Sequence, residues 1–312
     1  MKNSSPFFSI VIPTYGRPDR LKECLQAIAR SSYPRERFEV IVVDDGSDHP
    51  PEKVVRQIRN ILNITLLTQP HAGPATARNT GAKQAKGDYL VFTDDDCTPA
   101  PDYLQKLAAR FAQTPNGLVG GKTINTLTDN PYSSASQMLI DYIYAYFNAK
   151  EPRFFASNNF AVPNALFHRS GGFDATYPLA AAEDRDFCER WRSQGYGMVY
   201  APEALIYHAH VLTWRKFWRQ HFNYGRGAFH FHQARAKYNS ASIKVEPISF
   251  YFDLLRYPLA QASGRRALRL TALMAVAQAA NTAGFFREML MREKDAGTLQ
   301  HIPAIGKGDS VS

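Results

Sequence analysis

Short apolar runs alternate with amphipathic segments over the first hundred residues of the chain. The runs are rich in β-branched and aromatic residues, which predicts strands buried on both faces, at residues 7–12, 38–43, 64–67 and 89–92. Between them, apolar residues recur at helical spacing, and we expect Asp19 to cap the first helix and Pro74 to open the third. Strands that alternate with helices predict a mostly parallel α/β sheet with right-handed crossovers.

The regular alternation ends soon after residue 100. A helix with Leu104, Leu107 and Phe111 and a strand over 118–124 still follow the pattern. We then expect an aromatic-rich helix over 132–155, a strand over 160–167, a helix from Glu183 to Gly195 and a strand over 198–200. The chain therefore divides into an α/β domain over 1–212, with halves at about 7–125 and 126–212, a helical region over 213–298 and a tail over 299–312.

Acidic residues follow two of the predicted strands directly. Asp44 and Asp45 come after the second strand, and Asp94, Asp95 and Asp96 come after the fourth. The carboxyl ends of parallel strands form the ligand-binding edge of open α/β sheets. In an extended segment Asp94 and Asp96 would point to one side and Asp95 to the other. Three adjacent carboxylates indicate either a solvated acidic turn or a site for a hard divalent cation such as Mg²⁺ or Mn²⁺.

Charge is concentrated in the C-terminal third. The net charge is +9, and residues 201–292 hold thirteen basic side chains against four acidic ones. Such an excess is typical of surfaces that meet anionic lipid, polyphosphate or nucleic acid. The three cysteines are too few for a disulfide framework and fit a reducing cytoplasm. We expect no signal peptide at the N-terminus, and the uncharged stretch 270–286 is too short and too polar for a membrane span.

Two common nucleotide-binding patterns are missing. Neither Gly-x-Gly-x-x-Gly nor the phosphate-loop Gly-Lys-Ser/Thr pattern occurs, which argues against a dinucleotide oxidoreductase and an ordinary nucleotide hydrolase. A nucleotide diphosphate held through a metal ion remains as the natural ligand of the acidic edge.

Six short motifs in a fixed order resemble glycosyltransferase family 2, whose members have the GT-A fold. The motifs are Ser-Ile-Val-Ile-Pro-Thr-Tyr at 9–15, Val-Val-Asp-Asp-Gly-Ser at 42–47, Ala-Arg-Asn-Thr-Gly-Ala at 77–82, Phe-Thr-Asp-Asp-Asp at 92–96, Gly-Gly-Phe-Asp at 171–174 and Glu-Asp at 183–184. The resemblance implies a GT-A-like, mostly parallel twisted sheet flanked by helices. It makes 7–125 the nucleotide-binding half and 126–212 the acceptor half.

The resemblance also assigns the donor site. It places the nucleotide base, usually uracil, and the rest of the donor against Pro13, Tyr15, Asp45, Arg78, Asp94 and Asp95. Asp94–Asp96 correspond to the DxD element, in which Asp95 would face the ribose and Asp96 would bind Mn²⁺ or Mg²⁺. Asp44 would stabilise the turn. His208 is a second candidate metal ligand, although an ordinary structural histidine is an open alternative.

The acceptor side is assigned in the same way. Asp184 resembles the general base of inverting members, and Glu183 beside it should make Asp184 more basic. Alternatively, both acids only stabilise the N-terminus of their helix. The residues expected on the acceptor-facing wall are Asn158, Asn159, Gly172 and Glu183. The side-chain amides of the two asparagines can hydrogen-bond to sugar hydroxyls. Alternatively, the asparagines and the glycine are ordinary turn residues.

The function that we expect is metal-dependent, inverting transfer of a sugar from a nucleotide diphosphate donor, a UDP-sugar, to a saccharide or lipid-linked hydroxyl, as in cell-envelope polysaccharide synthesis. A Gln-x-x-Arg-Trp element is missing, which favours a non-processive enzyme. The aromatic and basic region 213–298 would lie on an anionic membrane, at the inner face of the cell membrane, or pack on the catalytic domain. The alternatives are a sugar nucleotidyltransferase and a non-catalytic nucleotide-sugar-binding protein at a membrane surface. Nucleic-acid binding is the least favoured.

Overall fold

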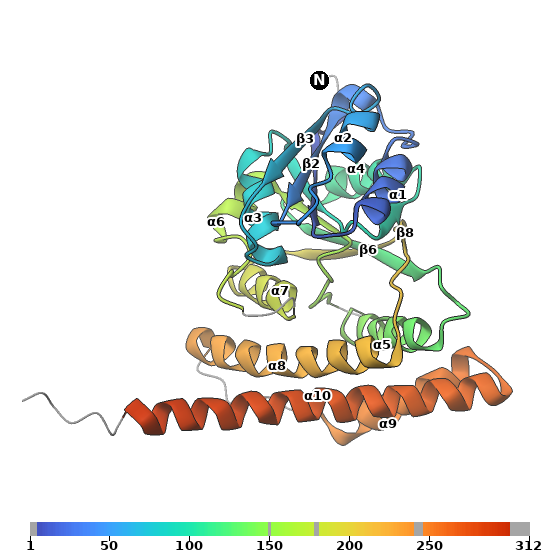
Figure 1. Cartoon of the computed structure of the whole chain (residues 1–312), viewed down its shortest axis with the longest axis vertical. Helices are drawn as coiled ribbons and strands as arrows, with labels where there is room; N and C mark the ends of the chain where they lie inside the picture. The colour runs from blue at the N-terminus through green and yellow to red at the C-terminus, as the bar shows by residue number, and fades with distance from the viewer. Residues whose placement is uncertain (1–4, 149–150, 178–180, 240–245, 300–312) are drawn as a thin grey trace, which may run out of the picture.

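The computed structural model describes residues 5–148, 151–177, 181–239 and 246–299. In these residues an α/β domain stands on a layer of long C-terminal helices (Figure 1). The predicted tail lies, from residue 300 onward, outside the described residues.

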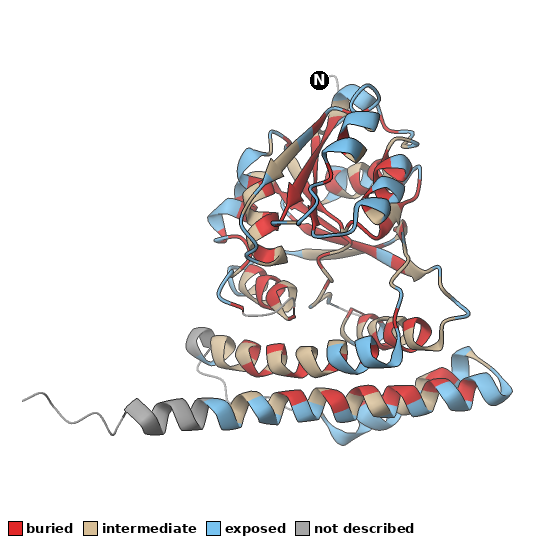
Figure 2. Cartoon of the chain, viewed as in Figure 1, coloured by how far each residue is buried: buried red, intermediate tan, exposed pale blue. Residues whose placement is uncertain are grey.

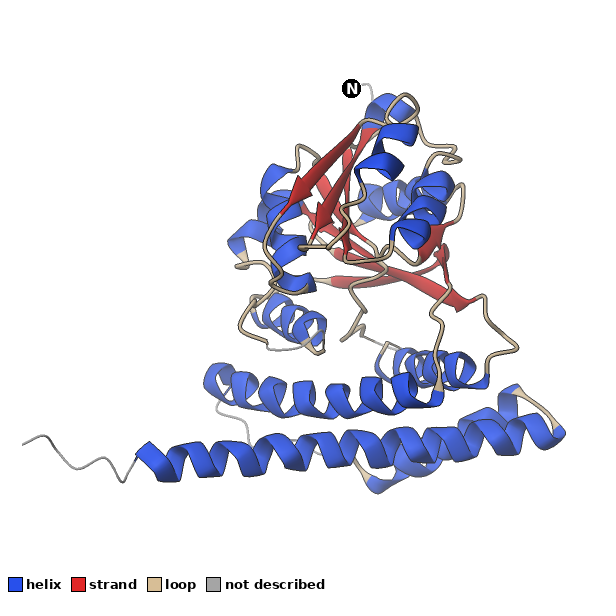
Figure 3. Cartoon of the chain, in the orientation of Figure 1, coloured by secondary structure: helices blue, strands red, loops and turns tan. Residues whose placement is uncertain are grey.

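One eight-stranded sheet forms the centre of the α/β domain (Figure 3). Its strands are β1 (Phe8–Thr14), β2 (Phe38–Asp44), β3 (Ile64–Thr68), β4 (Tyr89–Phe92), β5 (Cys97–Pro99), β6 (Leu118–Asn125), β7 (Phe160–Pro163) and β8 (Met198–His208). The spatial order is β3-β2-β1-β4-β7-β6-β8-β5. Strands β1 to β4 are parallel where they pair, β7 is antiparallel to β4 and β6, and β5 is antiparallel to β8. The sheet is therefore mixed but mostly parallel, as the sequence predicts.

Helices cover both faces of the sheet. The helices are α1 (Pro18–Ile28), α2 (Glu52–Ile58), α3 (Pro74–Gln84), α4 (Tyr103–Gln113), α5 (Pro131–Phe147), α6 (Asn164–Arg169), α7 (Glu183–Ser193), α8 (Trp214–Asn239), α9 (Ile248–Gln261) and α10 (Gly264–Leu299), with a 3-10 turn at Arg35–Arg37. Apolar residues of α1, α2 and α4 fill the core on one face. Those of α3, α6 and α7 fill the core on the other, and both cores are red in Figure 2. Strands β1 and β2 are buried along their whole length, because helices cover both faces of the sheet there.

Four local predictions are wrong, and one of them is the strand predicted over 198–200, which extends as β8 to His208. Helix α5 ends at Phe147, because Asn148 caps the turn and accepts a hydrogen bond from the amide of Arg153. Strand β7 ends at Pro163, whose ring nitrogen cannot donate to a sheet, and α6 begins there. Helix α1 begins at Pro18, so Asp19 lies in its first turn and does not cap it. Pro74 opens α3 as expected.

The C-terminal helices form a platform beneath the sheet. Helices α8 and α10 run side by side, with α5 and α9 packed against them (Figure 1). Two apolar clusters hold the platform together, one between α5, α8 and α10 and one between α5, α9 and α10. None of the helices in the described ranges is long and apolar enough to cross a membrane.

The register of the parallel strands determines where the loops gather. Thr14 pairs with Asp44, and Val11 pairs with Phe92, so β1, β2 and β4 end at the same edge of the sheet. This edge faces α5 and α8 of the platform, and the loops that carry the acidic residues lie between the two layers. The space between sheet and platform is therefore the place to look for a site.

Candidate active site

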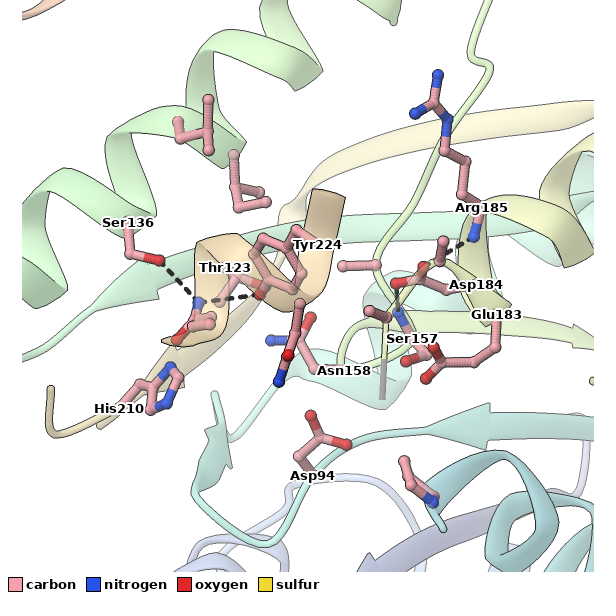
Figure 4. Close-up of a pocket in the computed structure, with 18 of the residues that line it drawn as sticks. Asp94, Thr123, Ser136, Ser157, Asn158, Glu183, Asp184, Arg185, His210 and Tyr224 are labelled. Atoms are coloured by element: carbon pink, nitrogen blue, oxygen red, sulfur yellow. Dashed lines mark hydrogen bonds between the residues drawn. The ribbon is translucent and has the colours of Figure 1, made fainter. Parts of the chain in front are cut away.

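A cavity of about 810 Å³ lies between the carboxyl edge of the sheet and the platform. Its walls come from loops after β1, β2 and β4, from the start of α7, and from α5 and α8. Figure 4 shows Glu183 and Asp184 on one side, and Asn158 between Tyr224 and Asp94. A space of this size is typical of pockets for small-molecule ligands.

The three consecutive aspartates separate into two environments. Asp94 and Asp96 line the cavity, whereas Asp95 is fully buried behind them. Asp95 accepts a hydrogen bond of 2.7 Å from the Thr14 hydroxyl and pairs with Arg17. Burial raises the pKa of Asp95 to about 7, although Arg17 opposes the shift. Asp94 and Asp96 therefore lie on the cavity side, as expected for an extended segment, whereas Asp95, the residue expected to face the ribose, is buried away from the cavity.

Asp96 and His208 form the candidate metal site. The antiparallel pairing of β5 with β8 sets His208 opposite Cys97. It brings His208 Nε2 within 3.2 Å of Asp96 Oδ1. Burial alone would raise the pKa of Asp96, but the hydrogen bond and charge of His208, with Arg17, hold it below its usual value. An ionised carboxylate beside an imidazole is a donor set that fits Mn²⁺ once the imidazole gives up its proton.

Cys97 lies in the same cluster but is a poor ligand. The ligating atoms of Asp96, Cys97 and His208 all lie within 4.8 Å of one another. Burial, and then the charges of Asp94 and Asp96, raise the pKa of the Cys97 thiol well above its usual value. A soft sulfur ligand is also a poor match for a hard cation such as Mg²⁺ or Mn²⁺, which leaves Asp96 and His208 as the ligands of the cluster.

Arg17 is a cation that the sequence interpretation missed. Its guanidinium pairs with Asp95 at 2.7 Å and with Asp96 at 2.9 Å, while its side chain remains 48% exposed. The only signal was its place in the short loop after β1, directly before the proline that starts α1. Arg17 neutralises the aspartate cluster and lines the cavity.

The residues expected to contact the nucleotide base belong to the wall of the cavity. Pro13, Tyr15 and Asp45 all line it, as predicted. The Asp45 carboxylate accepts hydrogen bonds from the amides of Ala72 and Gly73 and so fixes the loop before α3. That loop presents His71, which was not predicted and stacks on Tyr15 with ring centroids 4.4 Å apart. Asp44 hydrogen-bonds to Ser47 and stabilises its own turn, as expected.

Arg78 connects the two acidic regions. It comes from α3, is buried, and pairs with Asp94 at 2.7 Å and with Glu183 at 3.2 Å. Burial and the neighbouring Asp184 charge raise the pKa of Glu183 to about 7, against the opposing effect of Arg78. Both terminal nitrogens of Arg78 are therefore engaged with carboxylates that line the cavity.

Asp184 stands in the first turn of α7 and faces the cavity (Figure 4). Its oxygens accept hydrogen bonds from the amides of Arg185, at 2.7 Å, and Ser157, at 3.3 Å. Burial raises its pKa above the usual value, and the predicted effect of Glu183 on it stays a prediction. Ala182 just before it has a left-handed backbone with φ 74°, a strained conformation of the kind that clusters at functional sites.

The acceptor wall differs from the prediction at two residues. Asn158 and Glu183 line the cavity. Asn159 does not, because its side chain is fully buried and bonds to Tyr103 and Thr123 inside the fold. Gly172 does not either. It forms a turn with φ +65°, and its carbonyl accepts a hydrogen bond from Arg190.

The platform supplies wall residues that no sequence pattern indicated. From α8, Gln220 donates to Ser136 and to the Tyr224 hydroxyl, both at 2.9 Å (Figure 4). From α5, Ile140 and Ile143 give the cavity an apolar side. These residues reach the cavity only because α5 and α8 pack against a sheet whose strands are far from them in the chain. No local sequence pattern could therefore identify them.

Comparison with known proteins places the chain among sugar-transferring enzymes. Residues 9–175 match the family described as glycosyl transferase family 2. The chain is 27% identical over 233 residues to Glycosyltransferase AglE of Haloferax volcanii, covering 73% of this chain and 74% of that protein. It spans about half the length of the next curated relatives that it matches.

Two solved structures share the fold. One is the mannosyltransferase PcManGT from Pyrobaculum calidifontis in complex with GDP-Man and Mn²⁺, with a TM-score of 0.60, 21% identity, and coverage of 96% of this chain and 82% of that one. The other is residues 1–349 of S. aureus TarS in complex with UDP-GlcNAc, with a TM-score of 0.54, 19% identity and 92% of both chains covered. At these identities the likeness establishes the GT-A-like arrangement of sheet and helices.

Proposed function

Because the chain belongs to glycosyltransferase family 2 and is thus a nucleotide-sugar glycosyltransferase, we propose that it is a metal-dependent, inverting, non-processive enzyme. It moves the sugar of a UDP-linked donor to the hydroxyl of a saccharide or lipid-linked acceptor. The observation that carries the proposal is that one cavity joins the ionised Asp96, beside His208, to the basic carboxylate of Asp184.

Asp184 acts as the general base. The acceptor hydroxyl enters between Asp184 and the anomeric carbon, and Asp184 takes its proton as the oxygen attacks. The bond to the diphosphate oxygen breaks on the opposite face of the sugar. Backbone amides hold the carboxylate in place, and its raised pKa brings it closer to the operating pH, where a base is most effective.

Cations on the donor side receive the departing diphosphate. Asp96 and His208 would hold Mn²⁺, which supplies charge neutralisation at the diphosphate oxygens when it is bound. Arg17 is half exposed beside them and can shift from the aspartates to a phosphate oxygen. Arg78 keeps Asp94 and Glu183 together, so its direct contact with the donor stays a prediction of the family resemblance.

The nucleotide base lies against Tyr15 and Asp45 in this proposal. The structures of similar fold hold GDP-Man in one case and UDP-GlcNAc in the other. We propose uridine as the nucleoside of the donor on the basis of the motif resemblance. Turnover of a panel of donors with different bases tests this choice. The family match argues against a sugar nucleotidyltransferase and a non-catalytic protein.

The test is release of nucleoside diphosphate from UDP-, GDP- and dTDP-sugars with Mn²⁺, with Mg²⁺ and with a chelator. We expect one donor to be hydrolysed slowly without acceptor, in a metal-dependent manner. Asp96→Asn should abolish the metal-dependent binding of that donor. Asp102→Asn, an isosteric change at a half-exposed aspartate before α4, should leave it unchanged.

Two outcomes would contradict the proposal. If no donor binds with any metal, the acidic edge is not a nucleotide-sugar site. If Asp96→Asn binds and hydrolyses the donor as the wild type does, the metal site is elsewhere.

A further inference from the structure

Exposed apolar side chains are concentrated on the platform. Ten of the fifteen large hydrophobic residues that the described structure exposes lie between Trp214 and Met291. Soluble surfaces normally carry such residues singly, whereas a contiguous set marks a surface that meets a partner or a membrane. The set on α9 and α10 is not explained by the active site, because it lies on the far side of the platform from the cavity.

Helix α10 has two apolar stripes. The inner one contacts α5, α8 and α9 through residues such as Leu270, Leu273 and Met274. The outer stripe consists of exposed residues at helical spacing: Leu268, Ala272, Ala275, Ala279, Phe286 and Leu290. Because these positions recur three, four or seven residues apart, they lie on one side of the helix. No charged residue occurs between Arg269 and Arg287.

Helix α9 adds a second apolar stripe beside the first. Ile248, Phe252 and Leu259 recur four and seven residues apart, and they are 76%, 58% and 52% exposed. Figure 2 shows pale blue segments along α9 and along the side of α10 away from α8. The two helices pack against each other, so their outer stripes form one surface.

Arginines flank this surface. Residues 247–291 contain five arginines and two acids. Arg265, Arg269 and Arg287 are exposed along one edge of the outer stripe, and Arg256 is exposed on α9. Of the two acids, Glu288 is engaged by Arg226. An apolar stripe with basic residues at its edge is complementary to the acyl chains and phosphates of an anionic bilayer.

A second copy of the chain would suit the surface less well. A two-fold interface brings the same patch of both copies together, so it must be self-complementary. Joining two copies would bring the arginines of both into one interface, and within residues 247–291 Asp253 is the one exposed acid on each copy to offset them.

We propose that the outer faces of α9 and α10 dock on an anionic phospholipid membrane, with the stripes in the acyl boundary and the arginines at the lipid phosphates. The inner side of the same helices supports α5 and α8, which line the active-site cavity. Docking would thus set the platform on the bilayer and the sheet away from it. This inference does not rest on the donor or on the base, so it can fail while the proposed reaction stands.

The test is sedimentation of the full chain with vesicles of phosphatidylcholine alone and of phosphatidylcholine mixed with phosphatidylglycerol. We expect binding to the anionic vesicles. Leu268→Ser with Phe286→Ser should weaken it about tenfold or more, because two exposed apolar side chains no longer enter the interface. Arg265→Gln with Arg269→Gln should weaken it by a similar factor.

Matched controls lie on α2 and just after it, at the opposite end of the molecule (Figure 1). Ile61→Ser removes a 47% exposed apolar side chain, and Arg56→Gln with Arg59→Gln removes the same charge from exposed positions. Both should bind vesicles as the wild type does. A single Phe286→Trp variant gives a second readout, since its fluorescence should shift to the blue on anionic vesicles.

Three results would overturn the proposal. The wild type could fail to sediment with anionic vesicles, or the platform variants could bind as well as the wild type. The wild type could instead be a dimer that Leu268→Ser with Phe286→Ser separates, with no vesicle binding, in which case a second copy covers the stripes.

Discussion

At the scale of single residues, the site depends on carboxylates that ionise at different pH. His208 and Arg17 outweigh burial at Asp96 and keep its pKa low, so it stays charged. Burial dominates at Glu183 and Asp184 and raises the pKa of both. When carboxylates in one cavity have pKa values that differ widely, the one with the low pKa can bind a metal and the one with the raised pKa can accept a proton. Here the division follows from the neighbours of each carboxylate.

Glu183 should make stability depend on pH. Its folded pKa is about 7, above the ordinary value of 4.5, so between these values the folded protein binds a proton that the unfolded chain has lost. Stability should therefore fall as pH rises from about 4.5 to about 7 and then level off. Relative to Glu183→Gln, the wild type should lose on the order of 2–3 kcal/mol over this window, measured by urea unfolding at several pH values.

Glu203→Gln is the contrasting control. A hydrogen bond from Arg110 lowers the pKa of Glu203, so its stabilisation is present above the ordinary value and lost as pH falls through the folded pKa. The difference between this variant and the wild type should change only below about pH 4.5. If the Glu183→Gln and wild-type curves stay parallel from acid to neutral pH, the buried, proton-binding state of Glu183 is wrong.

Motifs brought only part of the predicted site to the cavity wall. Asp94, Asp96 and Asp184 lie in motifs and line the cavity, and so does Asn158, which lies in none, whereas Gly172 lies in a motif and does not line it. Asn159 does not line the cavity, because the side chains of neighbouring residues point to opposite sides and Asn159 points into the fold. No pattern in the sequence says which of the two asparagines faces the cavity. His71 and Arg17 were missed because single polar residues in loops carry no periodicity.

At the scale of elements, continuous apolar runs predicted the strands reliably, whereas the ends of helices and strands were predicted less well. Strand β4 has the predicted bounds, and β1, β2 and β3 differ from the prediction only at their ends. The errors at 132–155 and 160–167 both come from a capping residue or a proline that outweighed an apolar run. The short strand β5 was not predicted, because it exists only through its pairing with β8.

Close contact between α8 and α10 should depend on glycine. A Cβ at Gly225 would lie 1.8 Å from the carbonyl oxygen of Asn281, and one at Gly284 would lie 1.9 Å from that of Phe222. Gly225→Ala should therefore force the helices apart and destabilise the protein by about 1–3 kcal/mol, seen as a lower midpoint of thermal unfolding.

Gly197→Ala is the matched change in open space, because nothing lies within 4 Å of its added Cβ. It should leave the midpoint nearly unchanged. Equal midpoints for Gly225→Ala and the wild type would mean that α8 and α10 do not approach as closely as the structure has them.

At the scale of the whole molecule, the cavity exists because two layers meet. The sheet edge supplies carboxylates and cations, and the platform closes the space with Gln220, Tyr224 and the apolar side of α5. The sequence indicated the first layer through its motifs and the second only as a helical, basic region. Contacts between residues about one hundred positions apart, such as the hydrogen bond from Tyr142 to the carbonyl of Phe250, cannot be predicted from local sequence patterns.

The most direct test of Asp184 as the general base compares three proteins: the wild type, Asp184→Asn and Asp129→Asn. For each, donor binding and nucleoside diphosphate release are measured. Asp129 is an exposed aspartate before α5 and gives the isosteric control. We predict that Asp184→Asn binds the donor with unchanged affinity but turns it over roughly 10²- to 10⁴-fold more slowly, while Asp129→Asn matches the wild type. Turnover by Asp184→Asn at the wild-type rate would contradict its role as the base, and loss of donor binding would place Asp184 in the donor site instead.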